Sequence, residues 1–354
     1  MAYETKKEIE NAYLVGVLFS NKEDVEVSLK ELKSLSETAG LNVVGQNYQL
    51  VRQVTPATLI GSGKLEEIKN ELEMLNVNVV VFDYELTGSQ ARNLSDYLNV
   101  KVIDRITLIL DIFAQRAISN EGKLQVELAQ LKYNLPRLAG ISGTSGRFGG
   151  AGVGMRGPGE TKLELNKRVA QGNILKLEKE IEKIKQNRQV QRKARFDNQM
   201  FKVAIVGYTN AGKSTLLNLI TKSSIYADDK LFATLDTTSR VVWLSEGKKI
   251  LLTDTVGFIS KLPHDLVDAF SSTLEEAKDA DLILHVIDIS NKHYKNQVDV
   301  VNEVLANLGV SCPIIKVYNK CDKIEEQAEQ DGIYISAKQK IGIEQLKEEI
   351  QNKM

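Results

Sequence analysis

The chain has 354 residues, of which 42% are hydrophobic and 26% charged, an ordinary composition for a globular protein with two or three cores. Its formal net charge of −1 excludes a protein that is basic over its whole surface. The two cysteines, Cys312 and Cys321, match no metal-binding spacing and predict a reducing compartment without disulfides. No apolar run approaches the ~18 residues of a membrane span, and the N-terminus is a poor signal peptide, so a cytoplasmic protein without a membrane span is expected.

Residues 1–105 alternate between strand-like and helix-like patterns. Three Val-rich runs bounded by polar turns are typical of strands: 12–19, 43–51 and 77–83. Helical spacing of apolar residues follows at 24–39 and again after Gly63. This alternation predicts a small N-terminal α/β domain with a mainly parallel sheet.

Residues 106–198 are predicted to form a coiled-coil-like helical hairpin. Apolar residues recur three and four positions apart in two segments: Leu124, Leu128, Leu131, Leu135 and Leu138, then Ile174, Leu177, Ile181 and Ile184. Between them, the glycine-rich loop 140–159 holds nine glycines and cannot be regular structure, because glycine loses too much backbone freedom in a helix.

The hairpin is basic. Residues 121–200 contain 16 Lys and Arg against 8 Asp and Glu, a net of +8, so the rest of the chain sums to −9. A basic arm with a glycine tip can follow RNA phosphates without reading sequence, with Arg137, Arg147 and Arg156 as candidate contacts. The alternative is a solvated charged face.

Residues 199–354 return to alternating strands and helices. Strands are predicted at 202–207, 248–257, 281–290 and 313–322, and a final helix at 343–351. We expect one α/β nucleotide-binding domain with a mainly parallel sheet.

The string GYTNAGKS, between the first of these strands and a helix, matches the phosphate loop G-x-x-x-x-G-K-[ST]. It consists of Gly207, Tyr208, Thr209, Asn210, Ala211, Gly212, Lys213 and Ser214. Backbone N–H groups at a helix N-terminus bind phosphate. We expect Lys213 to reach the β and γ phosphates and Ser214 to hold Mg²⁺.

The string DTVG comprises Asp254, Thr255, Val256 and Gly257. A carboxylate at a strand end near the phosphates predicts a second Mg²⁺ contact through Asp254, and Gly257 allows its N–H to approach the γ-phosphate. Next comes Phe258, where many signalling GTPases carry a glutamine that orients the attacking water. The sequence therefore predicts slow hydrolysis that needs a partner or a cation. Asn210 either holds that cation, K⁺, or only caps the local backbone.

Two later strings predict a guanine pocket: Asn319, Lys320, Cys321 and Asp322, then Ser336, Ala337 and Lys338. A carboxylate can accept from guanine N1–H and the exocyclic amine, a donor pair that adenine lacks. A main-chain N–H of the second string would reach guanine O6. Residues 231–238 occupy the position of a switch loop, where Thr234, Thr237 and Thr238 each offer a hydroxyl to Mg²⁺; spacing alone does not choose among them.

These strings, together with FATLD and GVGMRGPGETKLE (152–164), resemble the HflX family of ribosome-associated GTPases, P-loop proteins of the Obg–HflX type. The resemblance covers nearly the whole chain. It assigns Ser214 and Thr234 to Mg²⁺, and it adds a switch segment to the nucleotide contacts: Phe232, Ala233, Thr234, Leu235 and Asp236. The residues expected to act at the reacting phosphate are Lys213, Thr234, Gly257 and Asn210.

The resemblance also implies a partner, the large (50S) ribosomal subunit with its rRNA. It implies splitting of stalled or idle 70S ribosomes, with the N-terminal half near the peptidyl-transferase region and with hydrolysis stimulated by the subunit. A monomer is expected off the ribosome. Two alternatives remain open, namely a regulatory switch that acts on a protein effector, and an RNA-binding chaperone or ATPase that uses the N-terminal domain.

The chain departs from the family pattern in places. Members usually carry an acidic residue and an arginine shortly after GPGE, where this chain has Asn166 and Lys167. Many members carry a further C-terminal domain, whose ribosome contacts are expected to be absent here. An adenine-nucleotide site has been suspected in the family, but the string 61–64 (GSGK) lacks the first glycine of a phosphate loop, so we interpret it as a helix start.

Overall fold

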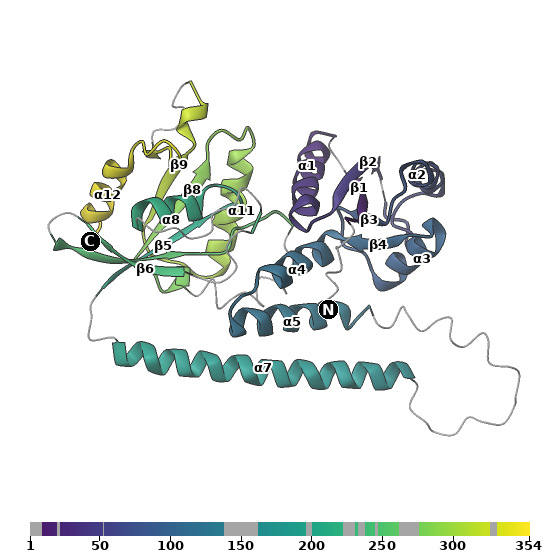
Figure 1. The fold of residues 1–354 in the computed structure, drawn as a ribbon, viewed down its shortest axis with the longest axis horizontal. Helices are drawn as coiled ribbons and strands as arrows, with labels where there is room; N and C mark the ends of the chain where they lie inside the picture. The colour runs from purple at the N-terminus through teal and green to yellow at the C-terminus, as the bar shows by residue number, and fades with distance from the viewer. Residues whose placement is uncertain are drawn as a thin grey trace, which may run out of the picture. The chain divides into compact units, whose positions relative to one another are not determined.

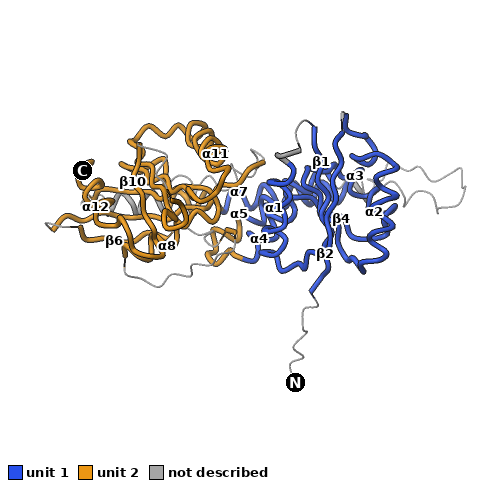
Figure 2. The backbone as a smooth tube through the Cα atoms, turned by 90° about the horizontal axis from the view of Figure 1, so that it is seen from above, with its two compact units in different colours: residues 1–115, 126–180 blue, residues 116–125, 181–354 orange. Residues whose placement is uncertain are grey.

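The computed structural model describes residues 9–19, 22–51, 53–137, 162–195, 200–221, 231–232, 238–244, 247–261, 276–325 and 331–354. The backbone divides into two compact units, residues 1–115 with 126–180 and residues 116–125 with 181–354, coloured blue and orange in Figure 2. Each unit holds one β-sheet. The boundaries 1–105, 106–198 and 199–354 remain predictions.

The sheet of the first unit is fully parallel, with the strand order β2-β1-β3-β4. Its elements are β1 (Asn11–Leu18), α1 (Lys22–Thr38), β2 (Asn42–Leu50), α2 (Ser62–Leu75), β3 (Val79–Phe82), α3 (Gly88–Leu98), β4 (Lys101–Asp104) and α4 (Arg105–Arg116) (Figure 1). The apolar residues of β1 and β3 are buried on both faces, as parallel sheets require. The predicted small α/β domain is confirmed.

The segment after Gly61 begins a helix, as predicted. Gly61 is the N-cap residue of α2, with extended backbone. The Lys64 ammonium donates to Asn47 Oδ1 at 3.2 Å and pairs with Glu67 Oε2 at 2.7 Å. This lysine is therefore held by neighbours in its own unit rather than presented in a phosphate loop.

Two helices, α5 (Asn120–Asn134) and α7 (Lys162–Arg195), correspond to the predicted hairpin. From residue 126 onward α5 lies in the first unit together with α7 up to residue 180, and the two run in opposite directions in Figure 1. Ile174, Leu177 and Ile181 are buried, so the predicted stripe of α7 is its packed side. The stripe of α5 is shorter than predicted because the helix ends before Leu135. The loop 140–159, Leu138, Arg147 and Arg156 lie outside the described residues.

The sheet of the second unit has the order β10-β9-β8-β5-β7-β6, and only the β6–β7 pairing is antiparallel. Its elements are β5 (Phe201–Gly207), α8 (Lys213–Thr221), β6 (Thr238–Trp243), β7 (Lys249–Asp254), β8 (Leu282–Asp288), α11 (Tyr294–Asn307), β9 (Ile314–Asn319), the 3₁₀ turn η2 (Cys321–Lys323), β10 (Gly332–Tyr334) and α12 (Ile343–Asn352). The predicted mainly parallel sheet is confirmed. The sequence had not indicated β6, β10 and α11 individually.

Helices cover both faces of this second sheet. Successive residues of β5 alternate between two cores: Val203 and Ile205 pack with residues of α8 and α12, whereas Ala204 and Val206 pack with residues of α11. The helices cover the two faces but not the end of the sheet where the parallel strands finish. Ligands of α/β sheets bind at this carboxyl end. Among the helices that the structure describes, none combines the length and apolar character needed to cross a bilayer.

Candidate functional site

The phosphate loop joins β5 to α8, and two of its glycines leave no room for a side chain. A Cβ on Gly207 would lie 2.2 Å from the Val286 carbonyl oxygen, and one on Gly212 would lie 2.2 Å from Asn319 Nδ2. Both glycines also have positive φ, 153° and 95°, which other residues rarely adopt. The loop therefore fits tightly against β8 and against the end of β9.

Lys213, the first residue of α8, is buried beneath this loop. Its ammonium donates to the carbonyl oxygens of Gly207 at 3.1 Å and Tyr208 at 2.9 Å. Burial lowers the pKa of Lys213 to about 8, and the negative charge of Asp254 offsets part of this effect. An anion in the loop would meet a cation already aimed by two main-chain acceptors.

Ser214 and Asp254 meet at the carboxyl end of β7. The Ser214 hydroxyl donates to Asp254 Oδ2 at 2.7 Å, and the carboxylate is buried. A hydroxyl beside a buried carboxylate is a donor set of the oxygen type that Mg²⁺ prefers. Thr238, one of three candidate switch threonines, is the first residue of β6 and pairs with Asp254. The others, Thr234 and Thr237, lie outside the described residues with Ala233, Leu235 and Asp236.

The segment after Asp254 is bonded to the phosphate loop through its backbone. Phe258 N–H donates to the Gly207 carbonyl at 3.1 Å, and Thr209 N–H donates to the Phe258 carbonyl at 2.7 Å. A Cβ on Gly257 would lie 2.8 Å from Lys213 Nζ. Gly257 is thus held directly beside the lysine ammonium.

The Phe258 side chain lies in the core. It is 3% exposed and packs in the cluster that contains Ala204, Val206 and Val301. A buried phenyl ring offers no hydrogen bond to water, which agrees with the prediction that this position cannot orient the attacking water.

The predicted base-binding strings are tied to each other and to the phosphate loop by Asn319. Its Nδ2 donates to the Ala211 carbonyl at 2.8 Å, and its Oδ1 accepts from Ala337 N–H at 3.0 Å. The pKa of Asp322 is lowered, chiefly by a hydrogen bond from Ser336. The Asp322 carboxylate is exposed, ionised at neutral pH and held by Ser336 of the second string.

Lys320 links the first of these strings to the phosphate loop and to β8. Its backbone is left-handed, and its ammonium donates to the Asn210 carbonyl at 2.9 Å and pairs with Asp288 Oδ2 at 2.7 Å. Sequence reasoning missed Asp288, which ends the apolar strand β8 at the carboxyl end of the sheet. An acidic residue at the carboxyl end of an apolar strand was the sequence signal that could have identified Asp288.

The remaining predicted positions lie around the same loop. Tyr208 is buried, and its hydroxyl accepts from Ser260 N–H at 2.7 Å. Thr255 is buried and donates to the Ile205 carbonyl at 2.8 Å. Cys321 N–H donates to the Ile335 carbonyl at 3.1 Å. Of the other predicted site residues, Phe232 and Val256 are buried and Lys338 is exposed.

Asn210 has a left-handed backbone, with φ 61°, a conformation that asparagine tolerates. Its side chain is exposed and makes no hydrogen bond to the parts of the chain that the structure describes. The expectation that it only caps the local backbone is therefore without support, and K⁺ binding stays open.

His285, in the middle of β8, is buried beneath the site and 1% exposed. Burial, and then the charges of Lys316 and Lys213, lower the pKa of His285 to about 4. The imidazole is therefore neutral in the folded protein, whereas it takes up a proton below pH 6.5 when the chain unfolds.

Replacing His285 with leucine should flatten the acid dependence of stability. The contribution of His285 to the free energy of unfolding is fully present above pH 6.5, and it is lost as the pH falls towards 4. The total loss is on the order of 3 kcal/mol. Urea unfolding at pH 7.5 and 5.0, followed by the fluorescence of Trp243, the single tryptophan, checks this within the second sheet. Equal losses in parent and variant between the two pH values would contradict it.

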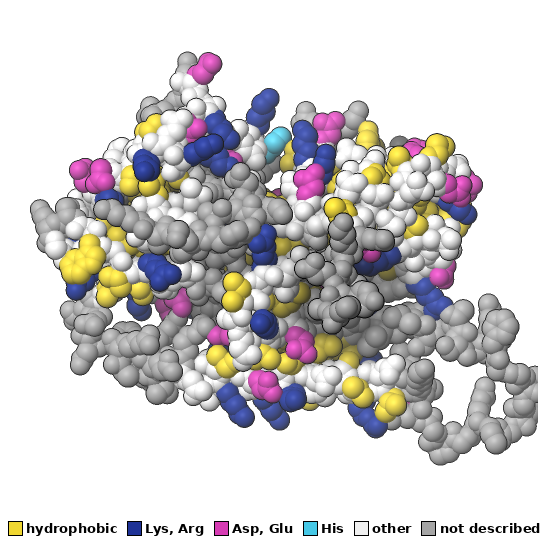
Figure 3. All heavy atoms as spheres, viewed as in Figure 1, with side chains coloured by type: hydrophobic (Ala, Val, Ile, Leu, Met, Phe, Trp, Pro, Cys, Tyr) yellow, Lys and Arg dark blue, Asp and Glu magenta, His cyan; other side chains and the backbone are white. Residues whose placement is uncertain are grey.

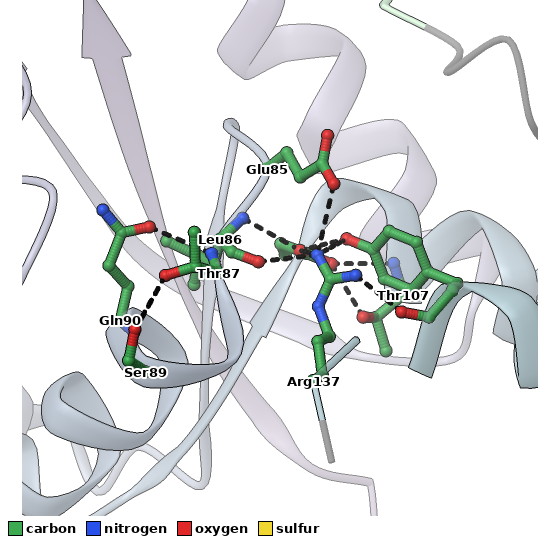
Figure 4. Close-up of polar contacts among 9 residues, drawn as sticks. Glu85, Leu86, Thr87, Ser89, Gln90, Thr107 and Arg137 are labelled. Carbon is green, nitrogen blue, oxygen red and sulfur yellow. Dashed lines mark hydrogen bonds and ion pairs between the residues drawn. The ribbon is translucent and has the colours of Figure 1, made fainter. Parts of the chain in front are cut away.

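Arg137 is bonded within the first unit, contrary to the expectation that it contacts RNA. Its Nη2 donates to the Leu86 carbonyl at 2.6 Å and pairs with Asp104 Oδ2 at 3.1 Å, and its guanidinium lies 3.4 Å from the ring centroid of Tyr133. Figure 4 shows the Arg137 side chain reaching Glu85 and Leu86, which lie between β3 and α3. A Cβ on Gly88 would lie 2.7 Å from the Arg137 carbonyl oxygen. Arg137 therefore fixes the point at which the chain leaves α5.

The exposed side of α7 carries a stripe of lysines. Lys176, Lys179 and Lys183 are exposed and lie three and four residues apart, so they share one face of the helix. At 100° per residue this face is opposite the buried one of Ile174, Leu177 and Ile181. In Figure 3, lysine and arginine side chains gather along the outer side of α7. We call Lys176, Lys179 and Lys183 the lysine stripe.

The chain matches three family models along its length. Residues 26–114 match the N-terminal region of GTP-binding GTPases, residues 116–195 their middle region, and residues 202–320 the 50S ribosome-binding GTPase. A GTPase HflX from Caldanaerobacter subterraneus subsp. tengcongensis is 52% identical over 354 residues, which cover 99% of this chain and 82% of that protein. The GTPase HflX of Escherichia coli K12 is 40% identical over 348 residues, 95% and 81% of the two chains.

Two solved structures share the architecture along almost the whole chain. A GTP-binding protein from the archaeon Sulfolobus solfataricus in complex with GDP is 29% identical, with a TM-score of 0.52 and coverage of 98% of both chains. The complex of SsGBP with GDP is 30% identical, with a TM-score of 0.56 and coverage of 97% of this chain and 98% of that one.

Proposed function

The chain belongs to the HflX family of GTPases, and on this premise we propose that it works on the large (50S) ribosomal subunit and separates stalled or idle 70S ribosomes. Hydrolysis of GTP to GDP and phosphate follows from the membership itself. The observation that carries the ribosomal part is the match of residues 202–320 to the 50S ribosome-binding GTPase model. A ribosomal partner would also locate the protein in the cytoplasm.

Lys213, Gly257 and Asp322 are proposed to hold the nucleotide. The buried ammonium of Lys213 would bind the β and γ phosphates, and the neighbouring Gly257 N–H would approach the γ-phosphate. Asp322, held by Ser336, would accept from N1–H and the exocyclic amine of guanine. Asn319 would keep the base and phosphate parts of the site in register through its two hydrogen bonds.

Ser214 and Asp254 are proposed to hold Mg²⁺, with Thr234 as a further ligand. The 2.7 Å contact between the Ser214 hydroxyl and the buried Asp254 carboxylate supports this assignment. Bound Mg²⁺ would neutralise charge on the phosphate oxygens. Ser214 and Asp254 would fix the position of the ion at the carboxyl end of β7.

Asn210 is proposed to hold K⁺, which would replace the assistance that Phe258 cannot give. Its exposed side chain has no hydrogen bond to the described residues and is therefore available to an ion beside the phosphates. Hydrolysis by the isolated chain is proposed to be slow for the same reason, because the side chain after Gly257 is part of the core.

The lysine stripe is the proposed RNA contact of α7. Its three ammonium groups project from the face opposite the packed side, so phosphates could approach without disturbing the fold. Its position within the basic stretch 121–200, with a net charge of +8, supports the same partner.

The test is GTP turnover with and without purified 50S subunits, together with co-sedimentation at increasing salt. We expect subunits to raise turnover at least about tenfold and binding to weaken steeply with salt. No stimulation together with no salt-sensitive binding would leave the alternative of a switch on a protein effector. Release of free subunits from 70S particles with GTP then tests the splitting activity.

A matched pair of variants examines the RNA contact. Lys176→Glu with Lys179→Glu should weaken subunit binding by about 10- to 100-fold. Lys30→Glu with Lys33→Glu makes the same charge change at exposed positions three residues apart on α1 and should have a much smaller effect. Equal loss from both pairs would assign the effect to net charge rather than to α7.

A further inference from the structure

The hydroxyl of Thr209, in the phosphate loop, is buried and has no hydrogen bond to the residues that the structure describes. The residue is 7% exposed, and Oγ1 has no partner among the described residues. The Thr209 backbone N–H is used, because it donates to the Phe258 carbonyl. Buried hydroxyls in native folds are usually paired, and leaving one unpaired destabilises the protein. The free-energy cost at this position therefore calls for an explanation.

The position of Thr209 supplies one. A Cβ built on Gly257 would lie 2.9 Å from Thr209 Cγ2 and 2.8 Å from Lys213 Nζ. The Thr209 side chain and the Lys213 ammonium thus flank the same point of the chain. In the proposed complex this is where the Lys213 ammonium and the Gly257 N–H meet the γ-phosphate.

The residue that follows Gly257 brings no polar side chain to this corner. Phe258 turns its ring into the core. A threonine hydroxyl can donate one hydrogen bond and accept others, so it can bind a phosphate oxygen or orient a water.

We propose that the Thr209 hydroxyl forms a hydrogen bond to an oxygen at the γ-phosphoryl end of bound GTP and is a catalytic residue of hydrolysis. In that reaction a water oxygen bonds to the γ phosphorus while the bond from phosphorus to the β–γ bridging oxygen breaks. GDP leaves with the electron pair of that bond, and a proton of the water passes to phosphate or solvent. The inference rests on the proposed nucleotide site but not on the ribosomal partner.

The test compares Thr209→Val, which keeps the shape and removes the hydroxyl, with Thr209→Ser, which keeps the hydroxyl. Single-turnover GTP hydrolysis is measured without ribosomes, alongside the affinities for GDP and for a non-hydrolysable GTP analogue. We expect Thr209→Val to slow hydrolysis by about 10- to 100-fold and to leave GDP affinity within about twofold, while Thr209→Ser stays close to the parent. The nucleotide-free valine variant should be at least as stable as the parent, because an unpaired buried hydroxyl is removed.

Each result has one meaning. Weaker analogue binding with unchanged GDP binding supports contact with a phosphate oxygen, and slower hydrolysis alone supports contact with the attacking water. Parent-like hydrolysis by Thr209→Val, equal loss in Thr209→Ser, or a matching loss of GDP affinity overturns the proposal. The Thr209 test contains no ribosomes, so its outcome does not depend on the ribosomal partner. If 50S subunits failed to stimulate the parent in the separate turnover experiment, only the proposed ribosomal function would be contradicted.

Discussion

Lys213→Ala should reduce GTP turnover by about 10²- to 10³-fold and weaken triphosphate binding more than GDP binding. Lys213 is the one buried lysine among the described residues, and its ammonium is held at the phosphate loop by the carbonyls of Gly207 and Tyr208. The variant removes this positive charge. Charge-assisted contacts to phosphate are roughly twice as strong as neutral ones, and a group that meets developing charge acts on the rate constant. Single-turnover hydrolysis and nucleotide titration measure both effects.

The same variant separates the nucleotide site from the proposed RNA arm. Lys213→Met serves as its control, because it keeps most of the buried volume and loses only the charge, so both variants should be equally inactive. Without nucleotide, both should still co-sediment with 50S subunits, since the lysine stripe is intact. If subunit binding disappeared in step with turnover, a separate RNA arm on α7 would be excluded.

Asp322→Asn should move the preference of the site from guanine towards xanthine nucleotides by about 10³-fold or more. The lowered pKa of Asp322 keeps its carboxylate ionised at neutral pH, ready to accept two N–H donors of guanine. An amide offers an N–H to the base instead, which suits the C2 carbonyl oxygen of xanthine and leaves the guanine amine opposed by another donor. Competition of GTP and XTP against a fluorescent nucleotide measures the shift.

Asp331→Asn is the matched control for Asp322. Asp331 belongs to the same unit and pairs with Lys316 rather than with a predicted nucleotide group. It should leave the preference for GTP unchanged. An unaltered preference in Asp322→Asn would show that the base site is misassigned, and an equal shift in both variants would assign the effect to charge alone.

The features that could be predicted from the sequence are those in which a short string of residues must adopt a fixed backbone shape around a ligand. The phosphate loop needs glycine at positions 207 and 212, because carbonyl and amide atoms lie where side chains would be. The atoms that impose this requirement belong to Val286 and Asn319, but the motif that meets it is a run of adjacent residues and can be recognised in the sequence. The parallel sheets were also foreseeable, because buried strands such as β8 carry continuous apolar runs.

Predictions failed or fell short where the answer depended on distant residues. Arg137 was expected on RNA, but Leu86, Asp104 and Tyr133 surround its guanidinium. The helix α5 ends at Asn134, although the leucine pattern continues beyond it. Asp288 was not predicted as a site residue, and its connection to the site is the ion pair with Lys320. The strands β6 and β10 were not predicted, because they are short strands at the two edges of the sheet.

The sequence by itself determined the two α/β sheets and the strings proposed to hold GTP, because each is encoded by local spacing of apolar residues or glycines. It indicated the family through the resemblance of those strings and of GVGMRGPGETKLE to family motifs. Only the tertiary structure decided which side chains are buried, which are hydrogen-bonded within the protein and which remain available to a ligand. It turned Phe258 into the core and tied Arg137 to other residues of the first unit. It also placed the Thr209 side chain next to Gly257 and left its hydroxyl without a hydrogen bond to the described residues. The physical reason is that burial and hydrogen bonding depend on groups far apart in the chain, and no local pattern records how those groups meet.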